Sequence, residues 1–222
     1  MPNRPELVVM LTYDDLTVPD ARAIFDRCRH TRAQYWGFKE QGLPLPEMKD
    51  LFAEMKACGK TTSLEVVTYT PDEGMAGAEM AAACGVDILM GTVYNDDICA
   101  FCKAHGMKYM PFVGEVSLRP SILEGTADAM IAEAQSYLKK GVDGFDFLGY
   151  RYTGDAFALN RAFVSAVKAP VCIAGSVNSF ERLEEVKQIA PWSFTVGSAF
   201  FDHVFGDSFA EQIDAVCDAL EK

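Results

Sequence analysis

Two short segments carry the residue types of an anion-binding site. Gly175 and Ser176 follow one apolar run, and Gly197 and Ser198 follow the next. Glycine lets the backbone approach a ligand closely, and the free N–H groups at the start of a following helix favour a phosphate. A single Gly-Ser pair is ordinary turn chemistry. Two such turns after consecutive strands predict that all four residues bind one phosphate.

Candidate acid–base residues lie in other apolar runs. In residues 144–147 the two phenylalanines should face helices, which turns Asp146 to the opposite face of a strand. The same alternation in residues 64–66 turns Glu65 inward. A buried carboxylate needs a charged or hydrogen-bonding partner, and Lys39, at the end of an apolar run, is the candidate. The alternatives are a purely structural salt bridge for the carboxylates and a solvated rim position for Lys39.

Further polar residues complete the candidate site. Asp14 follows the first apolar run, as a catalytic carboxylate or as a cap or turn residue beside Asp15. Glu115 follows the fifth run, and Tyr150 and Arg151 follow the sixth; we expect these three to bind substrate. The chain has only three histidines, two of them at predicted helix ends away from the site. Carboxylates are therefore expected to transfer protons.

A regular alternation of strands and helices positions these residues. The predicted strands are 7–13, 34–39, 62–69, 86–92, 107–113 and 142–148, with two more that begin at residues 171 and 193. The predicted helices are 18–32, 46–58, 70–85, 95–106, 121–140, 155–168, 179–189 and 208–220. Helix signals include the capping residues Thr70 and Asn178 at N-termini and Gly85 and Gly141 at C-termini.

The number of strand–helix units indicates the fold class. Eight units in 222 residues average about 28 residues each, the size of a minimal (β/α)8 TIM barrel. We therefore predict an α/β protein with a single (β/α)8 barrel domain over residues 1–222. Gly-Val-Asp occurs at residues 85–87 and again at 141–143, and this internal repeat supports the series of similar units. An open doubly wound sheet is the alternative, but no G-x-G-x-x-G follows the first strand.

Composition excludes several classes of partner. The formal net charge of −12 argues against nucleic acid and against an anionic membrane surface, because both require a basic patch. Seven cysteines without framework spacing, and no apolar segment of signal-peptide or membrane-span length, predict a cytoplasmic protein. We expect no cofactor and no metal. A small phosphorylated metabolite is the expected ligand, and a homodimer is compatible with the sequence.

Local segments resemble known families. Residues 194–199 resemble the strand-eight phosphate site of the ribulose-phosphate-binding barrels, and residues 148–154 resemble a loop of N-acylglucosamine-6-phosphate 2-epimerases. Asp14 and Lys39 resemble residues of the orotidine monophosphate decarboxylase group. The resemblance implies a phosphate-binding (β/α)8 barrel. The epimerases' catalytic Lys and Glu, the decarboxylases' Asp-x-Lys-x-x-Asp motif and the metal-binding pattern of ribulose-phosphate 3-epimerases have no match.

These observations predict an isomerase or epimerase that acts on a small phosphorylated sugar or related metabolite. Carboxylates would transfer the proton, and Lys39 would stabilise a developing enolate or tune the pKa of a neighbour. One alternative is a lyase of aldolase or decarboxylase type, with Lys39 as Schiff-base nucleophile or proton donor. The other is a barrel that binds a phosphometabolite without catalysis, because a fold alone licenses no activity.

Overall fold

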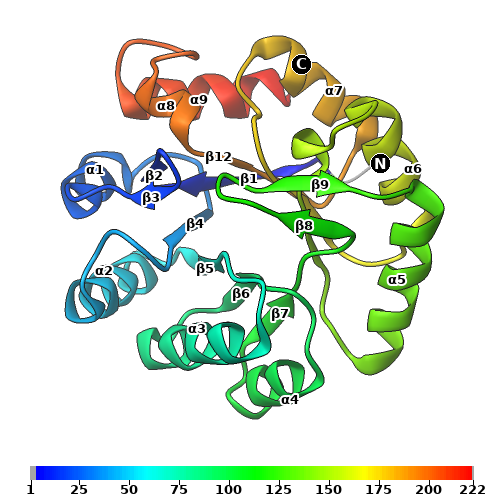
Figure 1. Cartoon of the computed structure of the whole chain (residues 1–222). Coiled ribbons are helices and arrows are strands. Elements are labelled where there is room, and N and C mark those ends of the chain that lie inside the picture. The colour runs from blue at the N-terminus through cyan, green and yellow to red at the C-terminus, as the bar shows by residue number, and fades with distance from the viewer. Residues whose placement is uncertain (1–3, 222) are drawn as a thin grey trace.

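The computed structural model describes residues 4–221, which form an eight-stranded parallel sheet rolled into a barrel (Figure 1). In order around the barrel the strands are β10 (Phe145–Phe147), β11 (Val171–Ile173), β12 (Ser193–Val196), β1 (Glu6–Met10), β4 (Tyr35–Lys39), β5 (Thr61–Val66), β6 (Ile88–Gly91) and β7 (Lys108–Met110). The N–H groups of Asp143 and Asp146 donate to the carbonyl oxygens of Tyr109 and Pro111 at 3.0 and 3.1 Å, which joins the two ends of this order. The predicted (β/α)8 barrel is confirmed.

Helices surround the barrel, each following one of its strands along the chain (Figure 1). They are α1 (Ala21–Cys28), α2 (Leu45–Ala57), α3 (Pro71–Cys84), α4 (Asp96–Ala104), α5 (Ala127–Lys140), α6 (Ala156–Ala166), α7 (Phe180–Ile189) and α9 (Phe209–Ala219). Thr70 caps α3 by accepting a hydrogen bond from the N–H of Glu73, and Gly85 and Gly141 end α3 and α5 with φ of 65° and 102°. The start of α3 and the ends of α3 and α5 match the prediction, whereas α1 is shorter than the predicted helix 18–32. None of the helices in the described part of the chain combines the length and apolar character needed to cross a membrane.

Side chains of the strands alternate between two environments. Those that point outward pack under the helices, as Phe147 does against Phe163 of α6, with ring centroids 3.9 Å apart. A smaller apolar cluster fills the inside of the barrel and consists of Val8, Met10, Ile88, Met90, Met110 and Cys172. Because successive residues of a strand face opposite sides, Glu65 and Asp146 turn inward, as the sequence pattern predicts.

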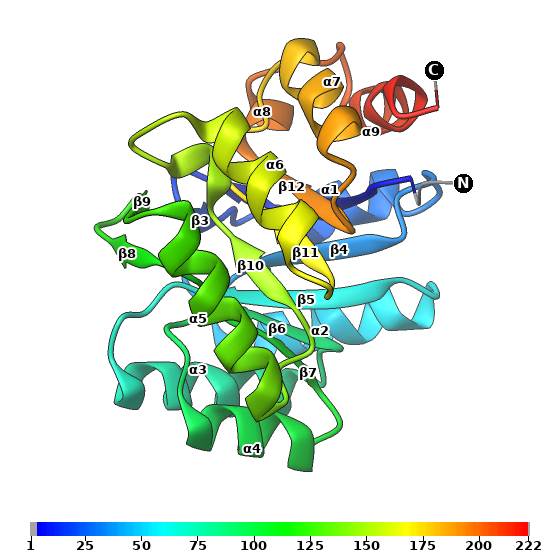
Figure 2. The ribbon, with the colours of Figure 1, turned by 90° about the vertical axis from the view of Figure 1, so that its right-hand side faces the viewer.

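Two hairpins interrupt the regular alternation. The predicted strand 7–13 ends at Met10, and residues 12–17 form a hairpin of β2 (Thr12–Tyr13) and β3 (Leu16–Thr17). The predicted helix 121–140 begins only at Ala127, because β8 (Glu115–Ser117) and β9 (Ile122–Glu124) form a second hairpin, which projects from the left-hand end of the barrel in Figure 2. Both predictions were wrong at these ends, since strands of two or three residues are too short to show a period-two pattern.

Short helices follow two of the strands at their C-terminal ends, and the cap of α7 differs from the predicted one. The 3-10 helix η1 (Gly149–Arg151) follows β10, and α8 (Ser198–Phe201) follows β12. Helix α7 begins one residue later than predicted, because the hydroxyl of Ser179 accepts the hydrogen bond from the N–H of Arg182 at 3.2 Å. Asn178, the predicted cap, is therefore free of that role and lines the cavity described below.

The repeated Gly-Val-Asp segment has a structural explanation. A carboxylate oxygen of Asp87 accepts hydrogen bonds from the N–H and the hydroxyl of Thr62, each 2.8 Å long. Asp143 accepts one from the N–H of Tyr109 at 3.0 Å. Each aspartate lies just before its own strand and ties it to the preceding parallel strand of the chain. The repeated Gly-Val-Asp segment therefore links neighbouring strands at the N-terminal end of the barrel.

Candidate active site

A cavity of about 170 Å³ opens at the C-terminal ends of the barrel strands. Active sites of (β/α)8 barrels are built at this end. Seven of the predicted site residues line it, namely Lys39, Glu65, Arg151, Gly175, Ser176, Gly197 and Ser198. Four predicted residues do not, namely Asp14, Glu115, Asp146 and Tyr150. Thr12, Asp15, Ser121, Asn178, Thr195 and Asp202 also line it and were not among the predicted site residues.

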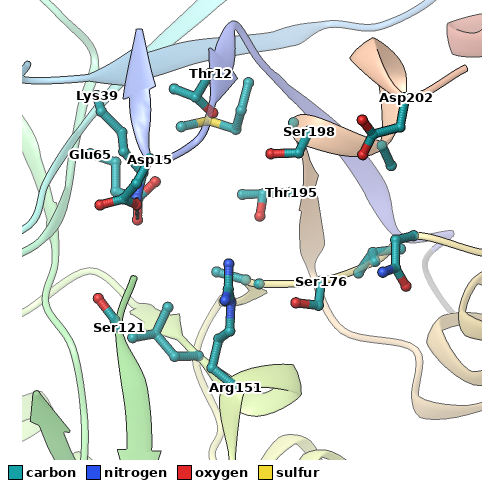
Figure 3. Close-up of a pocket in the computed structure, with 18 residues that line it drawn as sticks. Thr12, Asp15, Lys39, Glu65, Ser121, Arg151, Ser176, Thr195, Ser198 and Asp202 are labelled. Atoms are coloured by element: carbon teal, nitrogen blue, oxygen red, sulfur yellow. Dashed lines mark hydrogen bonds and ion pairs between the residues drawn. The ribbon is translucent and has the colours of Figure 1, made fainter. Parts of the chain in front are cut away.

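One side of the cavity holds a lysine between two carboxylates (Figure 3). Lys39 ends β4 and lies in register with Glu65 on β5. The Nζ atom of Lys39 is 3.5 Å from Oε1 of Glu65 and also forms an ion pair with Asp15. The side chains of Lys39 and Glu65 are only 12% and 10% exposed, so water screens their attraction weakly. The expected pairing of Glu65 with Lys39 is present.

Asp15, the neighbour of the predicted Asp14, reaches this cluster. The two aspartates form the two-residue loop of the β2–β3 hairpin, with φ of 46° and 66°. Hairpin loops of this length favour turns with positive φ, and aspartate tolerates that conformation. In this loop Asp15 reaches Lys39, whereas Asp14 is exposed and does not line the cavity. Sequence position alone could not tell which of two adjacent turn residues points inward.

The second hairpin brings a cation to the same cluster. Nε of Arg119, between β8 and β9, lies 2.6 Å from Oδ2 of Asp15, and Nη1 lies 3.0 Å from Oε1 of Glu40. Asp15 is therefore held between Lys39 and Arg119. Because 104 residues separate Arg119 from Asp15, no local pattern predicts this contact.

The other side of the cavity is formed by the two Gly-Ser turns (Figure 3). Gly175 and Ser176 have φ of 82° and 42°, and Gly197 immediately precedes α8. Within residues 4–221, the N–H groups of Gly175, Ser176, Gly197 and Ser198 form no hydrogen bond with another protein group. A Cβ atom on Gly197 would lie 2.8 Å from Oγ1 of Thr12, so the turn requires glycine there. These N–H groups are available to a ligand.

Arg151 completes this side of the cavity. It lies at the end of η1, and its Cγ would be 2.5 Å from a Cβ atom added to Gly175. Figure 3 shows its guanidinium directed into the cavity. Across the described range 4–221, the guanidinium forms no ion pair with a carboxylate. An arginine without a protein carboxylate is suited to bind a phosphate or carboxylate of a ligand.

Besides Asp14, three predicted residues lie outside the cavity, each for a different reason. Tyr150 is buried, with the guanidinium of Arg182 4.3 Å from its ring centroid. Glu115 lies on the exposed part of β8. Asp146 is fully buried within the barrel wall, below the residues that a ligand in the cavity would contact. Direct contact with substrate is therefore not available to these side chains in this structure.

Burial and charge together set the protonation of the cluster. Burial raises the pKa of Glu65; Lys39 opposes this, and Asp15 and Glu40 add to it. Burial alone would lower the pKa of Lys39, but the carboxylates of Glu65 and Asp15 outweigh it and raise the pKa. Burial also raises the pKa of Asp146 well above its ordinary value. Carboxyl groups with shifted pKa values in a cleft are typical of acid–base sites.

Comparison with known proteins places the fold but not the reaction. No family model and no curated protein matches the sequence. Among solved structures, orotidine 5'-phosphate decarboxylase from Pyrococcus horikoshii is similar with a TM-score of 0.73 and 14% identity, over 97% of this chain and 99% of that one. N-acetylmannosamine-6-phosphate 2-epimerase from Clostridium perfringens has a TM-score of 0.65 and 15% identity, over 87% and 86%. N-(5'-phosphoribosyl)anthranilate isomerase from Pyrococcus furiosus has a TM-score of 0.65 and 12% identity, over 98% of both chains.

These structural neighbours are ribulose-phosphate-binding (β/α)8 barrel enzymes, the group that the sequence segments resemble. They include a decarboxylase, an epimerase and an isomerase. At identities of 12% to 15% the likeness shows the fold alone. The residues of the cavity are therefore the guide to the reaction.

Proposed function

We propose that this protein is an isomerase or epimerase that acts on a small phosphorylated sugar or a related metabolite. The observation that carries the proposal is the composition of one cavity. Free backbone N–H groups and Arg151 form one side of it, and the Lys39–Glu65 pair forms another (Figure 3). A molecule bound by its phosphate at the first side would present its carbon chain to the second.

The phosphate is proposed to bind between the turns after β11 and β12. Adjacent parallel strands lie about 4.8 Å apart, so turns that leave them at the same level can enclose one tetrahedral anion. Gly175, Ser176, Gly197 and Ser198 supply N–H donors, and Arg151 supplies a positive charge. Such local donors suit a protein whose formal net charge is −12, because its overall field does not attract anions.

The proposed reaction begins with loss of a proton next to a carbonyl group. Glu65, as the carboxylate, removes the proton from carbon, and the electron pair of the broken C–H bond moves into an enolate. The Lys39 ammonium group stabilises the enolate oxygen. In an isomerase the protonated Glu65 then returns the proton to the adjoining carbon, whereas in an epimerase a second acid must deliver a proton to the opposite face of the same carbon. The raised pKa of Glu65 supports this role, because a general base works best when its pKa lies near the working pH.

The lyase alternative makes a different demand on Lys39. Schiff-base formation requires a neutral amine, whereas the carboxylates of Asp15 and Glu65 favour the ammonium form. The observed pairing therefore supports electrostatic stabilisation over nucleophilic attack. A barrel that binds without catalysis would keep the anion-binding turns and give the Lys39–Glu65 pair a structural role.

One experiment separates these functions. The protein is incubated in deuterated water with a panel of phosphorylated aldoses, ketoses and N-acylhexosamines, and the products are examined by NMR. An isomerase or epimerase incorporates deuterium at a carbon next to the carbonyl group. Cleavage, with borohydride trapping of an adduct at Lys39, would instead establish the lyase. Calorimetric binding without exchange or cleavage across the panel would show a binding protein and refute the proposed activity.

A further inference from the structure

Asp146 lies on β10, and its side chain turns into the interior of the barrel, beneath the cavity. Its side chain is 0% exposed, and its neighbours Phe145 and Phe147 both pack outward against Phe163. The strand register places Asp146 beside Cys172 of β11. A carboxyl group at this depth, in a strand of otherwise aromatic residues, is unusual, because aspartate is almost never fully buried without a partner.

Buried polar atoms on several strands of the barrel, Asp146 among them, lack protein partners. Neither carboxyl oxygen of Asp146 has a hydrogen-bond partner among residues 4–221, and the same holds for the hydroxyl groups of Ser63 and Ser193. Ser63 precedes Glu65 by two residues on β5, so it faces the same side one layer deeper. Buried polar atoms are nearly always bonded to protein or to ordered water. An ordered water bonded to the Asp146 carboxyl group would supply the partner that the protein does not.

An ionised Asp146 would have no counter-charge of its own. The charged groups that act on it are Glu65 of β5 and Lys39 of β4, and Cys172 of β11 is the other titratable neighbour. The inner side chains of β1, β6 and β7 are apolar, and β12 contributes a hydroxyl group. Lys39 already faces two carboxylates, since it pairs with both Asp15 and Glu65. A third carboxylate would be buried and unpaired, which is costly.

We propose that Asp146 is kept as a neutral carboxylic acid and acts as a positioning residue, donating a hydrogen bond to Glu65 through water held inside the barrel. The hydrogen bond stabilises Glu65 as a carboxylate, which is the form that removes a proton from substrate; this consequence rests on the function proposed above. When Glu65 takes up the substrate proton, Asp146 keeps its own. The direction of its pKa agrees, because burial raises it and Glu65 raises it further, against the opposing effect of Lys39.

Infrared spectroscopy tests the protonation state without any substrate. At about pH 8 ordinary carboxyl groups are ionised, so a protonated-acid carbonyl band must come from a group with a raised pKa. We expect this band in the parent protein and in Glu65→Gln, and its loss in Asp146→Asn. Asp87→Asn, which changes a carboxylate with a lowered pKa, is the matched control and should keep the band. A parent protein without the band, or a band lost in Glu65→Gln but kept in Asp146→Asn, would overturn the proposal.

The pH dependence of unfolding is an independent test. A carboxyl whose pKa is higher in the folded than in the unfolded state contributes stability that is complete below about pH 4 and is lost as the pH rises to the folded-state pKa. Relative to Asp146→Asn, the unfolding equilibrium constant of the parent should therefore increase by up to about tenfold per pH unit in that window. Asp146→Ser provides a second neutral variant should Asp146→Asn fold poorly. Parallel pH curves for the parent and a folded neutral variant would contradict the proposal.

A kinetic test distinguishes positioning from a purely structural role. With a substrate found by deuterium exchange, Asp146→Leu should lower kcat by at least about tenfold and leave KM unchanged. Asp146→Asn can still donate a hydrogen bond and should recover part of the loss. Equal losses in the two variants would refute the positioning role. If no substrate is turned over, the proposed function fails, whereas the infrared and unfolding tests still decide the state of Asp146.

Discussion

The two ends of the barrel use carboxylates in opposite ways. At the N-terminal end, Asp87 accepts two hydrogen bonds from Thr62; although its burial raises the pKa, these bonds and Lys56 lower it overall. At the C-terminal end, burial raises the pKa of Glu65 and Asp146, and neither oxygen of Asp146 has a partner within residues 4–221. Carboxylates with full sets of partners stabilise the scaffold. At the other end, the raised pKa values fit the two roles that we propose, which are proton transfer for Glu65 and a retained proton for Asp146.

Glycines show the same division. Gly85 and Gly141 have positive φ, and a Cβ atom at either would meet no atom within 4 Å, so only backbone conformation requires glycine there. At Gly197 φ is −124°, which other residues can adopt, but a Cβ atom would be 2.8 Å from Oγ1 of Thr12. Lack of space requires glycine at residue 197, whereas conformation alone requires it at the two helix ends. We therefore expect stability and ligand binding to depend on different ends of the same barrel, and substitutions at each end to separate them.

The largest effect is expected at the C-terminal end. Glu65→Gln should lower kcat by at least about 100-fold, because a general base contributes about that much or more. Glu79→Gln, on the exposed face of α3, is the matched control and should leave the rate unchanged. Steady-state kinetics on the substrate identified by deuterium exchange gives the ratio. Near-normal turnover in Glu65→Gln, with an intact fold, would assign Glu65 to structure and remove the contrast between the two ends.

A substitution at Gly197 tests the anion-binding side of the cavity. Gly197→Asp should weaken binding of inorganic phosphate at least about tenfold, or about 1.4 kcal/mol, because it adds bulk beside Thr12 and a negative charge beside the ligand. Gly197→Ala adds the bulk alone and separates the two causes. Isothermal titration calorimetry measures the affinity, and thermal melting confirms the fold. Unchanged phosphate binding in Gly197→Asp would place the phosphate elsewhere.

Much of the difference between the two ends of the barrel could be predicted from the sequence, since it depends on local patterns. Apolar runs and helix-ending glycines predicted the barrel, and alternation within β5 and β10 predicted that Glu65 and Asp146 turn inward. Gly85 and Gly141 occupy the predicted left-handed positions because that conformation favours glycine wherever it occurs. The inward side chains and the helix ends depend on residues within one element, and the barrel depends on the repetition of such elements along the chain.

The hairpins could not be predicted in the same way. Their strands are two or three residues long, and their contacts join distant parts of the chain, as between Arg119 and Glu40, 79 residues apart. The choice of Asp15 over Asp14 depends on the turn that the hairpin imposes. Asp146 was expected to contact substrate, but depth below the cavity depends on the closed barrel and is not encoded in the alternation of one strand.

A substitution at the N-terminal end should change stability and leave catalysis intact. Asp87→Asn removes the charge that Thr62 and Lys56 bond, and should lower the free energy of unfolding by about 1 to 2 kcal/mol at neutral pH. Because the pKa of Asp87 is lowered by folding, this loss should fade as the pH falls below about 4. Urea unfolding across pH measures it. A variant with unchanged stability but reduced turnover would reverse the assignment of the two ends.

The smallest effect is expected at a helix end where an added Cβ atom would meet no other atom. Gly85→Val should lower the free energy of unfolding by about 1 kcal/mol, since φ of 65° disfavours a β-branched residue while the open space around it allows the side chain to fit. Gly85→Ala should cost less, because alanine tolerates positive φ better than valine. Phosphate affinity and turnover should match the parent in both variants. Equal stability of the valine variant and the parent in urea would mean that α3 does not require its left-handed ending, and that glycine at residue 85 marks no constraint on the scaffold.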